Sequence, residues 1–199
     1  MECRHCDLEW RVEHEYCPVC RRNFGGAIWP NIETEHEIEQ RGVLIACIRD
    51  AFRGTAPGNG TTIHEADLEG CYTDDSERLA ARAKDTETNW EDVPNWKIER
   101  FSSVMPFFDA EGYRFYIPAY MIWTLKNWRT SSLFIVDSVL WSFGYRSSDF
   151  NAERHQILSP VQLHASYRFI KHFCEFSGDE EQLHAMKTFW YKYAEPPKH

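Results

Sequence analysis

Four cysteines near the start of the chain have the spacing of a metal site. They form two Cys-x-x-Cys pairs, Cys3 with Cys6 and Cys17 with Cys20, with ten residues between the pairs. Each pair can form a tight turn that directs two sulfur atoms at one ion, and four thiolates in tetrahedral geometry select zinc or iron. The spacing therefore predicts one structural Zn²⁺ ion held by these four cysteines.

The segment between the two pairs is predicted to be a strand. Leu8, Trp10 and Val12 alternate with charged residues, so apolar side chains recur with a period of two. A strand between two metal-binding turns makes a zinc ribbon, which we place at residues 1–24. Such a short module cannot bury a core of its own, and structural zinc can contribute on the order of 10 to 16 kcal/mol of apparent binding energy to such folds.

Other chemistries fit these cysteines less well. A thioredoxin-like redox pair needs a βαβ unit, for which the segment leaves no room. A zinc deaminase needs H-x-E followed by P-C-x-x-C, whereas here His14 and Glu15 are adjacent and Pro18 follows Cys17. A mononuclear iron site of rubredoxin type is an alternative, although the spacing between the pairs is short for it. His5 and His14 are expected not to bind the ion, because four thiolates already complete the tetrahedron.

A second group of residues that could do chemistry begins at His64. The carboxylates that follow it are Glu65, Asp67, Glu69, Asp74 and Asp75. On a helix His64 and Asp67 share a face at i and i+3, as two ligands of a metal ion could. Glu65 is equally suited to cap a helix, and the helix macrodipole stabilises acidic residues in a first turn. We favour a structural or solubilising role, with an active site or a second metal site as the alternative.

The loop GTAPGNGTT, residues 54–62, brings glycines close to a predicted helix start, which could suit a phosphate group. It lacks the lysine of a Walker loop and has no strong strand before it. A plain flexible loop is therefore expected.

The charge of the chain is unevenly distributed. The formal net charge is -9, and residues 62–100 hold eleven acidic residues against five basic ones. Such a field repels phosphate backbones, so nucleic acid is an unlikely partner. The acidic stretch serves either solubility or contact with a basic partner protein.

Composition places the chain in the cytoplasm. Of the seven cysteines, four lie in Cys-x-x-Cys pairs, which in a reducing compartment favours metal binding over disulfides. Cys47, Cys71 and Cys174 lie in or near apolar helical stretches, where a buried, inert thiol is common. No apolar run approaches the roughly 20 residues needed to span a bilayer, and the N-terminus lacks a signal-peptide pattern.

Capping motifs predict most of the helices. Thr34-x-x-Glu37 begins a helix whose core stripe is expected at Ile38, Ile45, Ile48 and Phe52, ending before Gly54. Thr62-x-x-Glu65 and Asp74-x-x-Glu77 repeat the motif. Ser159-Pro160-Val161-Gln162 begins a helix to Gly178 with Leu163, Tyr167, Ile170 and Cys174 inward. Asp179-x-x-Gln182 begins a last helix with Leu183, Met186, Trp190 and Tyr193 inward. These two are expected to form a helical hairpin.

The middle of the chain is predicted to contain a short β-hairpin. Phe107-Phe108 and residues 113–117 flank the sequence DAEG, which has the character of a tight turn, and Pro118 then begins a helix. The run SSLFIVDSVLWSFGY is long enough to favour a helix. The expected fold is α+β and α-dominated, with a ribbon at 1–24, a linker at 25–35 and a mainly helical domain at 36–199.

Aromatic residues are the last notable feature of the sequence. The segment NWEDVPNW places Trp90 and Trp96 in one loop. Such side chains either attach a loop to the core or form a binding platform, and we favour packing.

Two parts of the chain resemble known families. The phrases CRHCDLEW and YCPVCRRNF resemble the short zinc ribbons that begin many bacterial proteins, which implies a structural adaptor. Residues 36–194 resemble an uncharacterised bacterial family of unknown function, on the strength of Ala51-Phe52, FFDAEGYRFYIPAYM, the helix start at Leu158-Ser159-Pro160, and Trp190. This second resemblance implies a domain but no activity.

The most consistent interpretation is a zinc-binding, non-enzymatic protein-interaction module with an acidic contact surface in residues 62–100. A concrete version is an immunity or antitoxin-like protein that neutralises a basic toxin. The alternatives are an enzyme that uses His64 with its acidic neighbours, and a nucleic-acid regulator that binds through Arg21 and Arg22 of the ribbon.

Overall fold

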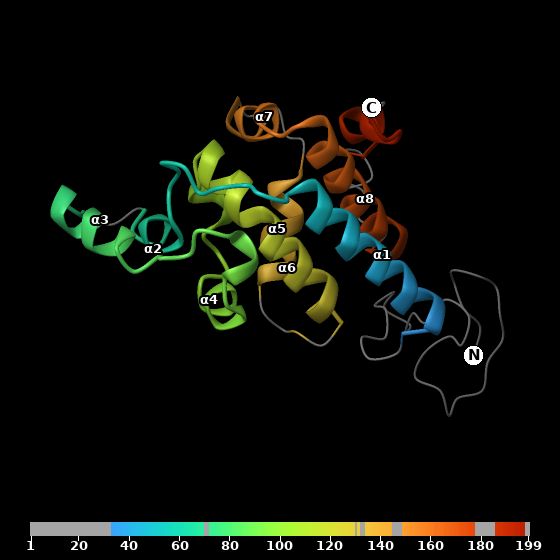
Figure 1. Ribbon diagram of the computed structural model, residues 1–199, viewed down its shortest axis with the longest axis horizontal. Helices are drawn as coiled ribbons and strands as arrows, with labels where there is room; N and C mark the ends of the chain where they lie inside the picture. Colours follow the sequence, from blue (N-terminus) through green and yellow to red (C-terminus); the bar gives the residue numbers. More distant parts are fainter. Residues whose placement is uncertain are drawn as a thin grey trace.

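The computed structural model describes residues 33–69, 72–129, 131, 134–144, 149–177 and 186–197 (Figure 1). Within these ranges every regular element is helical. The α-helices are α1 (Glu35–Ala51), α2 (Ile63–Ala66), α3 (Asp75–Arg82), α4 (Asn95–Arg100), α5 (Ala110–Asn127), α6 (Ile135–Ser142), α7 (Asp149–Gln156) and α8 (Pro160–Ser177). Short 3₁₀ helices are η1 (Trp90–Asp92), η2 (Met105–Phe107) and η3 (Trp190–Tyr193). The predicted ribbon and most of the predicted linker lie outside the described residues.

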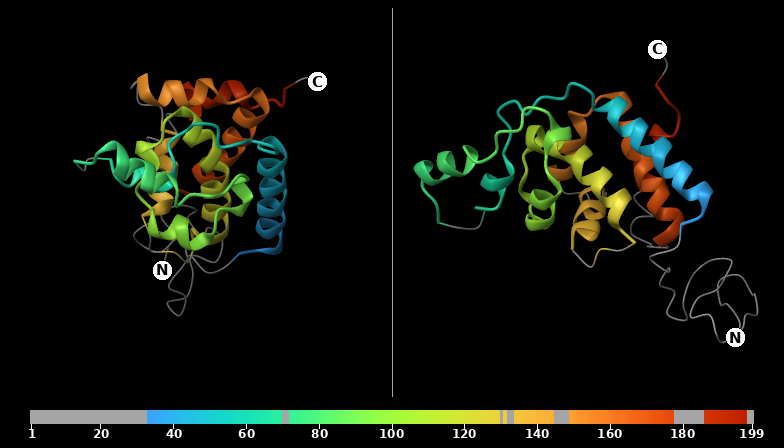
Figure 2. Two further views of the ribbon diagram at one scale, coloured as in Figure 1. Left: turned by 60° about the vertical axis from the view of Figure 1, so that its left-hand side comes forward. Right: turned by 60° about the horizontal axis from the view of Figure 1, so that its bottom comes forward.

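Helix α5 is the centre of the fold. It packs against α1, α4, α6, α7 and η1, and it runs through the middle of the molecule in Figures 1 and 2. From Gly112 to Leu125 every residue except Arg114 is buried. A helix that is covered on all sides shows no amphipathic period, so its sequence resembles a buried strand as much as a helix.

The predicted β-hairpin is wrong, because its two halves belong to helical segments. Asp109 is the N-cap of α5, and its Oδ1 accepts a hydrogen bond from the Gly112 amide at 2.7 Å. The sequence DAEG is therefore the cap and first turn of a helix. Pro118, expected to begin a helix, lies inside α5 instead. Its missing N–H removes one helical hydrogen bond, a cost that the packing around α5 offsets. The α+β class is corrected to α-only over the described residues.

Helix α1 begins as predicted and meets the core further along than expected. The Glu37 amide donates to Thr34 Oγ1 at 3.2 Å, and the Thr34 amide donates to Glu37 Oε2 at 2.7 Å. Ile48 and Phe52 are fully buried, but Ile38 is 48% exposed. Leu44, which was not expected in the stripe, is the first buried residue of the helix.

Helix α8 also begins at its predicted cap. The Ser159 amide donates to Gln162 Oε1 at 2.9 Å, and the Gln162 amide donates to Ser159 Oγ at 3.3 Å. Helices α1 and α8 lie side by side in both views of Figure 2. The expected start of the last helix at Asp179 lies outside the described residues. Trp190, in η3, is fully buried, and its Nε1 donates to the Phe143 carbonyl at 2.9 Å.

A buried histidine completes the aromatic core between α7 and η3. The ring of His155 has its centroid 4.9 Å from that of Trp190, 5.4 Å from Phe189 and 6.1 Å from Tyr113. It also stacks on Phe143 at 6.4 Å. Burial among these rings lowers the pKa of His155 to about 4, because the charged imidazolium loses its hydration.

The two tryptophans of NWEDVPNW have different environments. Trp90 is buried, and its Nε1 donates to the Phe52 carbonyl at 2.9 Å, so it attaches η1 to the end of α1. Trp96 is 57% exposed on α4. Within the run SSLFIVDSVLWSFGY, the predicted helix is confirmed for α6 at Ile135–Ser142. Among the described residues, no helix has the length and apolar character that a membrane span requires.

Candidate functional sites: an acidic arm and a cationic groove

The predicted zinc ligands lie in the part of the chain that the structure leaves undescribed. Cys3, Cys6, Cys17 and Cys20 all precede residue 33, so the zinc site stays a prediction. Among the described residues, no three His, Cys, Asp or Glu side chains are placed to hold a metal ion. Cys174 is buried and Cys47 partly buried, whereas Cys71 is not described.

His64 pairs with a residue that was not part of its predicted cluster. Its Nδ1 lies 2.8 Å from Asp85 Oδ1, and its backbone amide donates to Asp85 Oδ2 at 2.8 Å. Asp67, the predicted partner at i+3, is exposed instead. The predicted acidic neighbours of His64 therefore do not gather around it.

Asp85 belongs to a buried ionic cluster with Lys97 and Glu87. Lys97 Nζ donates to Asp85 Oδ1 at 2.8 Å and to Glu87 Oε1 at 2.5 Å. Burial alone raises the pKa of Asp85, but hydrogen bonds from Lys97 and His64 outweigh it and leave that pKa below its ordinary value. Burial likewise opposes the charge on Lys97, yet the two carboxylates raise its pKa.

This cluster attaches α2 to α4 and gives no access to a substrate. The side chain of Lys97 is 3% exposed and that of Asp85 is 1% exposed. No local sequence signal identifies either residue, because a lysine beside an exposed tryptophan on a short helix has the pattern of a surface position. Their role is structural, since the cluster holds the start of α2 in place.

The residues after α2 form a projecting segment that we call the acidic arm, comprising residues 67–69 and 72–82. It ends in α3, which lies at the edge of the molecule in Figure 1 and in the right-hand view of Figure 2. Arg78 pairs with Glu69 at 3.1 Å, and Arg82 pairs with Glu65 of α2 at 2.9 Å. Four further carboxylates of the arm face solvent: Asp67, Asp74, Asp75 and Glu77.

Two apolar side chains are exposed beside these carboxylates. Tyr72 is fully exposed, and Leu79 on α3 is 67% exposed. The residue of α3 that is buried is Ala81. A uniformly acidic surface serves solubility. Exposed apolar residues within a charged rim are instead characteristic of contact surfaces.

The loop at residues 54–62 presents its amides to carboxylates of the chain itself. The Asn59 amide donates to Glu111 Oε2 at 3.0 Å, and the Thr61 amide donates to Asp109 Oδ1 at 3.0 Å. Arg82 Nη2 in turn donates to the Gly60 carbonyl at 3.0 Å. Through these hydrogen bonds the loop joins the arm to the first turn of α5.

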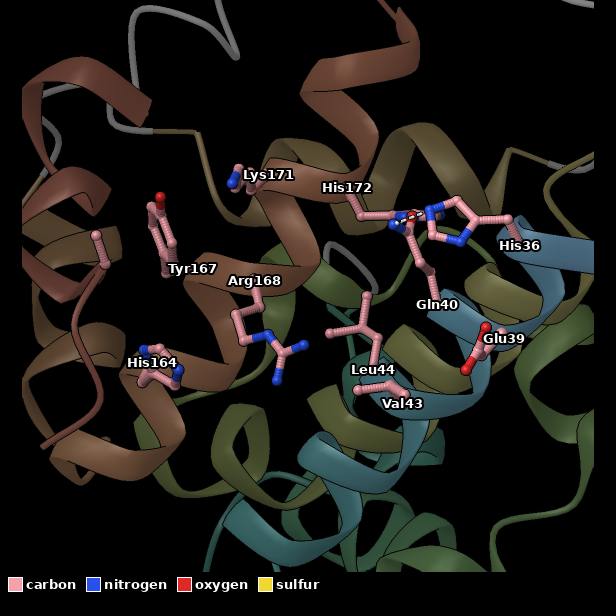
Figure 3. A pocket seen from close by; sticks show the side chains of 11 residues that line it. His36, Glu39, Gln40, Val43, Leu44, His164, Tyr167, Arg168, Lys171 and His172 are labelled. Carbon is pink, nitrogen blue, oxygen red and sulfur yellow. Dashed lines mark hydrogen bonds between the residues drawn. The ribbon is translucent and has the colours of Figure 1, made fainter.

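A second candidate site is the hollow of about 550 Å³ between α1 and α8, which we call the cationic groove (Figure 3). Its lining comes from α1 (His36, Glu39, Gln40, Val43, Leu44), from α8 (His164, Tyr167, Arg168, Lys171, His172) and from Ala194. His164, Arg168 and Lys171 recur at i, i+4 and i+7, so they share one face of α8. These three residues were not among the predicted site residues, although their spacing can be read in the sequence.

The histidines of the groove differ in their hydrogen bonds. His36 Nε2 lies 2.8 Å from Gln40 Nε2, and His164 Nδ1 donates to the Tyr193 carbonyl at 2.8 Å. Burial lowers the pKa of His172 to about 4, so this ring is neutral near pH 7. The permanent charges of the groove are those of Arg168, Lys171 and Glu39.

Most of the chain matches a known protein family. A model described as a family of unknown function (DUF6714) matches residues 40–194. The matched range agrees with the resemblance expected for residues 36–194, and it begins inside α1 and ends just after η3. Neither a curated protein nor a solved structure matches the chain.

Proposed function

The chain belongs to the DUF6714 family, whose function is unknown, and from this premise we propose that it is a non-enzymatic protein-interaction module. Its acidic arm binds a basic surface of a partner protein. An immunity or antitoxin-like protein that neutralises a basic toxin is one such module. The observation that carries the proposal is the pair of exposed apolar side chains, Tyr72 and Leu79, among the solvent-facing carboxylates of the arm.

The composition of the arm suits a basic partner. Both of its arginines already pair with carboxylates, so the four remaining carboxylates give the arm an uncompensated negative field. Complementary charge accelerates encounter and selects partners, while buried apolar side chains supply most of the affinity. Tyr72 and Leu79 supply the apolar contact, and the carboxylates supply the complementary charge.

The attachment of the arm also supports a role in binding. Arg82 bonds to the carbonyl of Gly60, and the same loop bonds to Asp109 and Glu111 at the start of α5. The cluster around Lys97 holds α2 from its other side. An arm presented by a rigid base loses less conformational entropy when it binds.

The zinc ribbon is the second part of the proposal. We place one structural Zn²⁺ ion on Cys3, Cys6, Cys17 and Cys20, with the ribbon acting as an adaptor beside the family domain. Four thiolates at this spacing provide the donor set that structural zinc prefers.

Affinity purification from a lysate of the source organism tests the proposal. The bait proteins are the native chain, Asp67→Lys, the double variant Tyr72→Ser/Leu79→Ser and two matched controls. Asp92→Lys makes the same charge change on η1, where Asp92 is also exposed. Val161→Ser removes an exposed apolar side chain from α8.

We expect the native chain and both controls to retain a basic protein. Both arm variants should fail to retain it. Its binding to the purified native chain should weaken as salt increases. Equal retention of every protein by all five baits would reject the arm as the contact surface. Thermal unfolding of each bait shows whether it is folded.

A further inference from the structure

From its lining we infer that the cationic groove between α1 and α8 binds a small organic anion, a carboxylate or phosphate group joined to an apolar body. Nothing in this inference depends on the acidic arm, which lies at the other end of the molecule (Figures 1 and 2). The groove therefore gives the chain a small-molecule site in addition to its proposed protein contact.

Arg168 is the central residue of this site. Its guanidinium points from α8 across the hollow toward Val43 and Leu44 of α1 (Figure 3). Within the part of the chain that the structure describes, the side chain of Arg168 has neither an ion pair nor a hydrogen bond with another residue. A guanidinium offers five donors in a planar fork that matches the oxygens of a carboxylate or phosphate.

The surroundings of Arg168 supply the other parts of such a site. Val43 is 52% exposed and forms an apolar floor with Leu44, which suits a hydrocarbon body. Lys171 lies one turn further along the same face of α8. His164 lies one turn before, with its ring held by the Tyr193 carbonyl. The lining thus combines apolar contact with polar groups of fixed position, the usual composition of a ligand site.

The size and charge of the groove define the ligand class. A hollow of about 550 Å³ lies within the range of small-molecule sites, roughly 300 to 1,000 Å³. Glu39 is its single carboxylate, and it lies on α1 away from the guanidinium in Figure 3. An anion placed against Arg168 therefore meets little repulsion.

Isothermal titration calorimetry of the full-length protein with three related probes tests the inference. The probes are phenyl phosphate, benzoate and phenol, which share a ring and differ in the charged group. Inorganic phosphate tests the charged group alone. We expect one equivalent of phenyl phosphate or benzoate to bind and phenol not to bind. The tighter of the two anions identifies phosphate or carboxylate as the recognised group.

Three variants separate the groove from general charge effects. Arg168→Gln should weaken binding by at least about tenfold, since hydrogen bonds to charged groups contribute roughly 1.5 to 3 kcal/mol. Val43→Glu should weaken it as much, because it places a carboxylate in the hollow and leaves Arg168 intact. Arg100→Gln removes an exposed charge from α4 and should leave binding unchanged.

Two outcomes would overturn the inference. One is the absence of heat for every anion with the native protein. The other is equal loss of binding in Arg100→Gln and Arg168→Gln, which would indicate a general charge effect. Val43 is exposed, so a folded Val43→Glu variant keeps the test decisive even if Arg168→Gln is unstable.

Discussion

Gly60 and Gly112 meet backbone to backbone: a Cβ atom added to Gly60 would lie 2.2 Å from the Gly112 amide nitrogen. The contact joins the loop before α2 to the first turn of α5. A Cβ on Gly112 would lie 2.3 Å from the Thr61 carbonyl oxygen. Neither position has room for a side chain, because the obstructing atoms belong to the backbone.

Gly112→Ala should therefore destabilise the protein. Overpacking against backbone costs about 1 to 3 kcal/mol, and here it should also disturb the loop that carries the arm. Gly42→Ala is the matched control, since a Cβ at Gly42 on α1 meets nothing within 4 Å. That change should stabilise the helix by about 0.5 to 1 kcal/mol. Urea unfolding measures both, and equal stabilities would contradict the close contact.

Lys97→Met should be more damaging than any surface change. It leaves Asp85 and Glu87 buried without their cation, and breaking such a pair costs about 3 to 5 kcal/mol. Lys84→Met removes an exposed lysine nearby and should shift the free energy of unfolding by less than about 0.5 kcal/mol. Limited proteolysis should also cleave the arm faster in Lys97→Met alone. A loss below about 1 kcal/mol would show that Lys97 is dispensable.

Acid should destabilise the native protein through His155. Its pKa is about 4 in the folded chain against an ordinary value of 6.5, so the unfolded state binds more protons between these values. The free energy of unfolding should therefore fall as the pH is lowered from 6.5 to 4, by about 3 kcal/mol from this residue. His155→Phe should flatten the decline in urea titrations across this pH range. An unchanged slope would assign the acid sensitivity to other groups.

Zinc content tests the ribbon independently of the arm. Elemental analysis by mass spectrometry should find one zinc per native chain and none in Cys17→Ser/Cys20→Ser. The helical circular dichroism signal should persist in the variant, because the described helices bury a continuous core of their own from Leu44 to Trp190. Loss of that signal would mean that the ribbon is part of the core. A second zinc that survives the mutation would indicate another site.

Local signals in the sequence predicted the helix starts well. Thr34 with Glu37, Asp74 with Glu77 and Ser159 with Gln162 all form the expected caps. A cap depends on residues three apart, so its chemistry is complete within one short stretch. The rest of the fold does not determine whether it forms.

Helix α5 could not be assigned in the same way. Residues 113–117 are aromatic, basic or β-branched, which favours a strand when one face is buried. Here neighbours cover α5 on all sides, and only the tertiary structure contains that information. The candidate sites could not be predicted from the sequence for the same reason. Asp85 meets Lys97 only after the chain has folded. The same is true of Arg168, which faces Val43.

The exposure of α3 divides the chain into parts that evolve under different constraints. Almost every residue of α5 from Gly112 to Leu125 is buried, so most substitutions there disturb several neighbours at once. The outer face of α3 touches solvent, so substitutions at Asp75 or Leu79 leave the core intact. Members of the family are therefore expected to keep α5 and to diverge on this face, which allows one scaffold to acquire new partners without refolding.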